Sequence, residues 1–132
     1  MNKTLIAAFV ASFGIAGIAA AQDAATPPAA PSLEDTYVSA RNQLGVLEYC
    51  QAAGFVEAEA IEVQNRMLGM IPVPDDTSAA DAAYAKGKEG TVSAMGVERS
   101  LSDAATEQGT TEDALCKQMD ALLQQLATQV PA

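Results

Sequence analysis

The segment LEDTYVSARNQLGVLEYCQAA, residues 33–53, decides the fold class. Ser32 precedes it as an N-cap, and Glu34 and Asp35 lie in its first turn, where the helix dipole favours negative charge. Apolar side chains recur every three or four residues and therefore share one face of an α-helix: Leu33, Tyr37, Ala40, Leu44, Leu47 and Cys50. The pattern predicts a helix over 33–53 that Gly54 ends.

Three segments downstream show the same helical spacing, with differing strength. Residues 56–71 carry a clear stripe that a proline-rich connection ends, and residues 110–130 carry another that begins with two threonine caps. Residues 79–108 show a weaker stripe that glycines interrupt. We expect one long, locally weakened helix ending at Gly109, with two helices joined near Gly90 as the alternative. No segment shows a convincing strand pattern.

Two cysteines link the first and last of these helices. Cys50 lies at the end of the first predicted helix and Cys116 near the start of the last. In an up-down bundle these two ends lie at the same pole, so the topology and a disulfide support each other. The sequence therefore predicts an all-α fold, a small up-down bundle of about four helices tied by one disulfide. The disulfide would close a loop with a sequence separation of 66, for which we predict a stabilisation of about 4 kcal/mol.

The N-terminal residues have the pattern of an export signal. Lys3 precedes an almost unbroken apolar run from Leu5 to Ala20, and small residues at 19–21 offer a cleavage site before Gln22. We predict a signal peptide over 1–21, a Pro/Ala-rich linker over 22–31 without regular structure, and one helical domain over 32–132. The predicted location is a bacterial periplasm, where a disulfide persists.

Composition narrows the classes of function. Because Lys3 belongs to the predicted leader, six of the seven basic residues remain against all 17 acidic ones. This balance argues against nucleic acid, whose phosphates need Lys and Arg, and favours a basic protein or an unfolded client as partner. The chain has no His, which removes the usual general base and the commonest metal ligand. We expect no enzyme, no cofactor, no metal, and no stable transmembrane segment after processing.

Two further features have both a functional and a structural interpretation. The segment KGKEG at 86–90 places glycines beside lysines, as phosphate-binding loops do, but it lacks the required spacing. A kink or a close approach of two helices is the preferred interpretation of its glycines. Met67, Met70 and Met95 would suit an adaptable binding surface, but ordinary core packing is the better interpretation.

Two blocks of sequence resemble a known family. ARNQLGVLEYC at 40–50 and GKEGTVSAMGVE at 87–98 resemble a family of small exported bacterial proteins labelled the pore-forming ESAT-6 family. The resemblance implies a pore-forming role and assigns no functional residue. The overall plan, exported, helical and tied by one disulfide, is also similar to that of the HdeA-type periplasmic acid-stress chaperones, which implies activation by acid.

The sequence thus favours a non-enzymatic periplasmic module for protein interaction or stress response. A pore-forming protein and an acid-activated chaperone are the alternatives. The candidate site residues are the disulfide pair Cys50 and Cys116.

Overall fold

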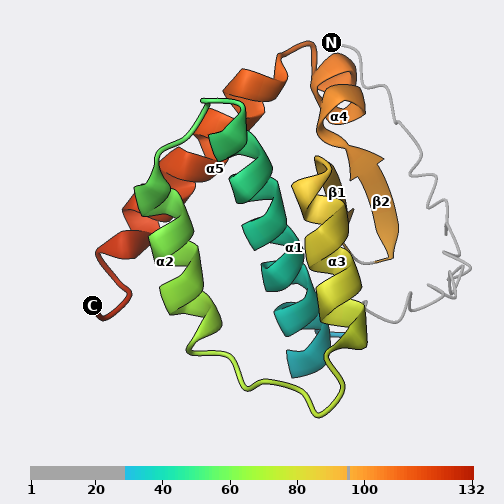
Figure 1. Cartoon of the computed structure of the whole chain (residues 1–132), viewed down its shortest axis with the longest axis vertical. Helices are drawn as coiled ribbons and strands as arrows, with labels where there is room; N and C mark the ends of the chain where they lie inside the picture. The colour runs from blue at the N-terminus through green and yellow to red at the C-terminus, as the bar shows by residue number, and fades with distance from the viewer. Residues whose placement is uncertain (1–28, 95) are drawn as a thin grey trace, which may run out of the picture.

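The computed structural model describes residues 29–94 and 96–132 (Figure 1). Within these ranges, five helices and one two-stranded sheet make up the fold, so the predicted helical class is confirmed, with five helices instead of about four. The predicted signal peptide 1–21, most of the predicted linker and Met95 lie outside the described residues.

Helix α1 (Leu33–Ala52) forms where the apolar stripe predicts it. Its first turn is closed by a capping box: Ser32 Oγ accepts a hydrogen bond from the Asp35 amide at 3.0 Å, and the Asp35 carboxylate accepts one from the Ser32 amide at 3.2 Å. After the helix, the Phe55 amide donates to the Cys50 carbonyl at 2.9 Å and turns the chain toward α2.

Helices α2 (Ala58–Leu68) and α5 (Glu112–Ala127) pack against α1 and against each other. Both are amphipathic and turn their apolar faces inward. One fully buried cluster joins these three helices and consists of Leu47, Ala60, Val63 and Leu123. A second surrounds the sulfur atoms and consists of Val46, Cys50, Val56, Leu101, Ala105, Leu115 and Cys116.

The predicted disulfide is present. Cys50 and Cys116 are fully buried, with an S–S distance of 2.02 Å and a Cα–Cα distance of 5.8 Å. It joins the end of α1 to the beginning of α5, as the predicted topology requires.

The expected long helix over 79–108 is wrong. The segment instead forms α3 (Ser78–Lys88), an antiparallel hairpin of β1 (Thr91–Ala94) and β2 (Val97–Ser100), and α4 (Leu101–Gln108). Gly90 and Gly96 have φ of +81° and +78°, values that end a right-handed helix and suit glycine. They therefore act as turn residues on either side of β1, and not as weak points of a helix.

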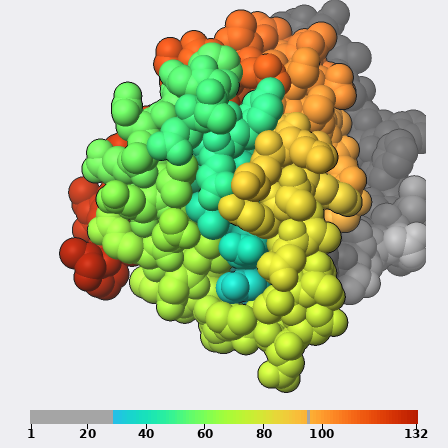
Figure 2. All heavy atoms as spheres, viewed as in Figure 1, coloured from blue at the N-terminus to red at the C-terminus, as the bar shows by residue number. Residues whose placement is uncertain are grey.

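Helices α1 and α3 cross in close contact at two glycines. A Cβ on Gly45 would lie 2.2 Å from the Tyr84 carbonyl oxygen, and one on Gly87 would lie 2.3 Å from the Asn42 carbonyl oxygen. In Figure 2, α1 is visible as a strip between the green atoms of α2 and the yellow atoms of α3. The close-approach interpretation of the glycines at 86–90 is confirmed at Gly87.

Asn42 holds the hairpin onto α1 and α3. Its side chain is 2 % exposed; Nδ2 donates to the carbonyls of Ala83 at 2.8 Å and Thr91 at 3.0 Å, and Oδ1 accepts from the Ser93 amide at 2.8 Å. Thr91 and Ser93 both belong to β1, so one amide side chain pairs with the outer edge of this strand as a neighbouring strand would.

Candidate interaction groove

The disulfide, which supplied the candidate site residues of the sequence analysis, lies in the hydrophobic core. Both sulfurs lie inside the second core cluster, and neither cysteine has exposed surface. Residues 29–94 and 96–132 also contain no group of three His, Cys, Asp or Glu side chains placed to hold a metal ion.

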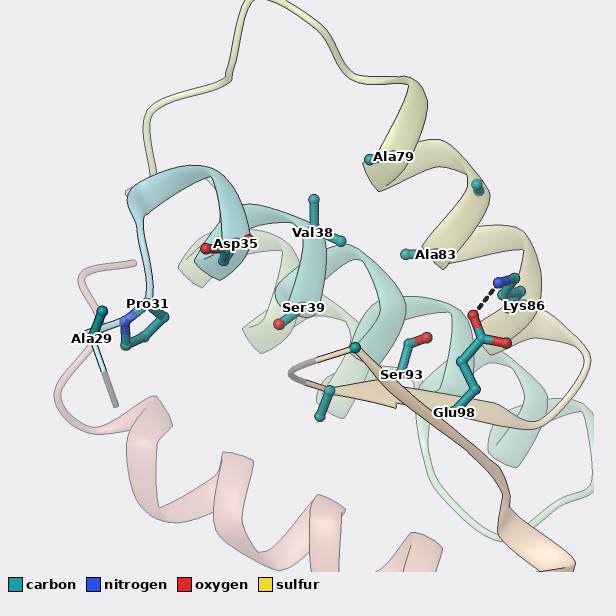
Figure 3. A pocket seen from close by; sticks show the side chains of 13 residues that line it. Ala29, Pro31, Asp35, Val38, Ser39, Ala79, Ala83, Lys86, Ser93 and Glu98 are labelled. Carbon is teal, nitrogen blue, oxygen red and sulfur yellow. Dashed lines mark hydrogen bonds and ion pairs between the residues drawn. The ribbon is translucent and has the colours of Figure 1, made fainter. Parts of the chain in front are cut away.

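A cavity of about 560 Å³ lies between the beginning of α1, α3 and the hairpin (Figure 3). Most of its wall consists of small side chains, among them Ser39 of α1, Ala79 and Ala83 of α3, and Ser93 of β1. Because these side chains are short, they do not fill the space between α1, α3 and the hairpin. We call this cavity the first compartment.

Two further cavities are related to the first through shared lining residues. A second compartment of about 300 Å³ shares Ser39, Ser93 and Ala94 with the first. A third, of about 660 Å³, shares Val92 and Met119 with the second and lies between the hairpin, α4 and α5. The three compartments thus follow one another along the hairpin through shared lining residues, and we call them together the long groove.

The walls of the long groove carry little net charge. The lining includes Asp35 and Glu98 as carboxylates and Lys86 and Arg99 as cations. Lys86 is paired with Glu98, and Arg99 with Glu107 on α4. The whole chain carries a formal charge of −10, so the groove is a neutral strip on a strongly acidic molecule.

The third compartment has the largest apolar lining of the three. No carboxylate lines it; the lining residues are Val92, Arg99, Leu101, Ala104, Gln108, Leu115, Gln118, Met119, Ala121, Leu122 and Gln125. Leu122 is 53 % exposed, whereas Leu115 and Leu123 of the same helix are buried. This compartment is the strongest candidate for contact with another molecule.

Two further ion pairs lie outside the lining of the groove. Arg41 pairs with Asp81 at 3.1 Å and Lys88 with Glu48 at 3.7 Å, and both pairs join α1 to α3. The Tyr84 ring lies 4.4 Å from the Arg41 guanidinium carbon and 5.5 Å from Lys88 Nζ.

These contacts shift three pKa values. The Tyr84 hydroxyl donates to Glu48 at 2.7 Å, and this bond raises the pKa of Tyr84. The negative charge of Glu112, 3.3 Å from the Tyr49 hydroxyl, raises the pKa of Tyr49. The hydrogen bond from Lys86 lowers the pKa of Glu98. Each shift favours the ionisation state that completes the contact.

The methionines fall into different environments. Met67 packs partly buried against the core of α1, α2 and α5, as the core interpretation predicts, whereas Met70 is 59 % exposed. The methionine of the long groove is Met119 of α5, which lines both the second and the third compartment. Its exposure to the groove depends on the hairpin, which the sequence did not predict.

No protein-family model, curated protein or solved structure matches this chain. Among the described residues, no helix combines the length and apolar character needed to cross a membrane. The pore-forming role implied by the family resemblance stays a prediction, which dye release from liposomes tests.

Proposed function

We propose that this chain is a non-enzymatic, exported module for protein interaction, and that the long groove binds an apolar segment of its partner. The observation that supports this proposal is the groove itself: three neighbouring compartments that share lining residues and have balanced charge, on a chain of formal charge −10. An apolar groove with few polar groups is the usual form of a peptide-binding site.

The chemistry of the groove favours an uncharged amphipathic segment as the partner. The third compartment offers apolar contacts from Val92, Leu101 and Met119, and hydrogen-bonding amides from Gln118 and Gln125 at its edge. A charged segment would gain little from Lys86, Glu98 and Arg99 of the lining, because these three are already paired within the chain. The disulfide supports the proposal of an exported protein, because disulfides persist in oxidising compartments.

Fluorescence anisotropy tests this function with a labelled, uncharged amphipathic helical peptide as the probe. Ala121 and Gln124 are both exposed on α5, but only Ala121 lines the groove. We expect Ala121→Arg to abolish peptide binding and the matched variant Gln124→Arg to retain it. Equal binding by both variants, or no binding by the unmodified protein, would contradict the proposed function.

A second function, an acid-activated chaperone, is favoured by the position of the ion pairs. Four of them connect α1, α3, β2 and α4: Arg41–Asp81, Glu48–Lys88, Lys86–Glu98 and Arg99–Glu107. The pKa of Glu98 is lowered in the folded state, so its pair stabilises the fold above the ordinary carboxyl range and loses this effect as pH falls. Acid strong enough to protonate Glu98 would therefore remove the ion pair that joins α3 to β2 beside the groove.

Aggregation of an unfolded client, followed by light scattering at neutral and acidic pH, separates the two functions. A chaperone of this kind suppresses aggregation only in acid, and Glu98→Gln should shift its onset toward neutral pH. Protection that is equal at both pH values would favour the plain interaction module.

A further inference from the structure

We propose that the third compartment of the long groove binds α5 of a second copy of this chain, in a two-fold symmetric dimer centred on Leu122. The inference rests on the proposed function, because it names one occupant of the same groove. Three observations carry it: the position of Leu122, the two glutamines beside it, and the charge of this face.

A projecting side chain and a recess lie on the same face of the molecule. Leu122 is 53 % exposed at the edge of the third compartment, while Leu101 and Leu115 are buried in its wall. A two-fold dimer uses one surface patch twice, so the patch must supply both the inserted group and the space that receives it. With Leu122 near the axis, the leucine of each copy enters the compartment of the other.

The glutamines on α5 fit the same symmetry. Gln118 lies four residues before Leu122 and Gln125 three residues after it, so all three follow one stripe of the helix. When two α5 helices cross antiparallel at Leu122, Gln118 of one copy lies beside Gln125 of the second copy. A primary amide carries both donors and an acceptor, so these identical side-chain types can pair across the axis.

Charge selects this face among those available to two copies. Each copy is strongly acidic, so contact through most of the surface brings carboxylates together. The third compartment contains no carboxylate, and its one charged residue, Arg99, is paired with Glu107. It is therefore a face on which two copies can meet without placing like charges in contact.

Sedimentation equilibrium of the disulfide-bonded protein, from low micromolar to near-millimolar concentration, tests the proposal. We expect a monomer–dimer equilibrium, and Leu122→Glu should weaken dimerisation by roughly tenfold or more. Met70 is the matched control, because it is similarly exposed at 59 % but lies at the end of α2, outside the groove. Met70→Glu should leave the dimer unchanged.

Crosslinking provides a second readout. Two residues near a two-fold axis face each other, so Leu122→Cys should oxidise to a covalent dimer and Met70→Cys should not. A monomer at every concentration, or equal effects of the two glutamate variants, would overturn the proposal. The dimer and the peptide would compete for the same compartment, so the anisotropy assay is run at a protein concentration where sedimentation shows the monomer. Peptide binding by a protein that never dimerises supports the proposed function and overturns the dimer, and a dimerising protein whose monomer binds no peptide supports the dimer alone.

Discussion

Replacing Gly45 by alanine should destabilise the fold through the crossing of α1 and α3. The added Cβ would lie 2.2 Å from the Tyr84 carbonyl oxygen and 2.9 Å from the Lys88 amide nitrogen, both backbone atoms that cannot rotate away. Helix α3 must then shift as a unit by about 1 Å, the overlap with normal packing distances. Asn42 would lose its hydrogen bonds to Ala83 and β1, which now measure 2.8–3.0 Å.

The two effects add to a large cost. Overpacking of this kind typically costs about 1–3 kcal/mol, and each hydrogen bond lengthened by the shift costs about 1 kcal/mol more. Against this, alanine gains about 1 kcal/mol over glycine in helix propensity. We expect Gly45→Ala to lower the free energy of unfolding by about 3 kcal/mol, or Tm by roughly 12–24 °C for a domain of this size.

Urea unfolding with the disulfide intact, followed by far-UV circular dichroism, measures the change. Gly69→Ala is the matched control, because a Cβ on Gly69 would lie at an ordinary contact distance of 3.4 Å from the Arg66 carbonyl oxygen, and its φ of −63° suits any residue. That variant should be unchanged or gain up to about 1 kcal/mol. If Gly45→Ala proves as stable as Gly69→Ala, the two helices do not cross at these glycines and the reasoning fails.

Three further predictions follow from contacts described above. The double variant Cys50→Ser with Cys116→Ser should lose about 4 kcal/mol of stability in urea, as expected for a closed loop with a sequence separation of 66. Asn42→Ala should lose about 2–4 kcal/mol, because it leaves buried backbone groups of α3 and β1 without partners, whereas exposed Asn65→Ala should change stability little. Absorbance titration should show Tyr84 ionising above the ordinary tyrosine range. Because its pKa is raised in the folded state, the contact with Glu48 stabilises the fold below that range, and this stabilisation is lost as pH rises through the raised pKa. The variant Glu48→Gln should lower the pKa of Tyr84.

Each of these has a result that would contradict it. A reduced protein as stable as the oxidised one would contradict the disulfide prediction. Equal losses from Asn42→Ala and Asn65→Ala would show that the Asn42 side chain holds nothing in place. An unchanged tyrosine titration in Glu48→Gln would remove the carboxylate as the cause of the shift.

Helices α1, α2 and α5 could be predicted from the sequence because each carries an apolar stripe, and α1 and α5 also begin at a capping side chain. Ser32 and Thr111 accept hydrogen bonds from amides of the first turn, and apolar residues recur at helical spacing behind them. The cysteine pair then fixed which helix ends meet, and the disulfide is present between them. The apolar spacing and the cysteine pair were therefore sufficient to predict these three helices and the disulfide.

The hairpin was missed because its residues satisfied a weak helical pattern. Two signals could have found it: the β-branched Thr91, Val92 and Val97 around Gly96, and Ser100 followed by Asp103 as a new helix cap. The short strands are held largely by Asn42, nearly fifty residues earlier in the chain, which no local window includes. Since the groove needs the hairpin as one wall, the sequence could not predict the groove either.

The disulfide also makes a closed ring of much of the chain. α2, α3, both strands and α4 all lie between its two cysteines, as does the largely exposed connection over 69–77. A protease that cuts this connection once leaves the two pieces joined through sulfur, and the buried clusters still hold them in place. Such a clipped molecule would keep its mass on a non-reducing gel and separate into two pieces only after reduction. A single cut in this connection would therefore not release either piece from the folded protein.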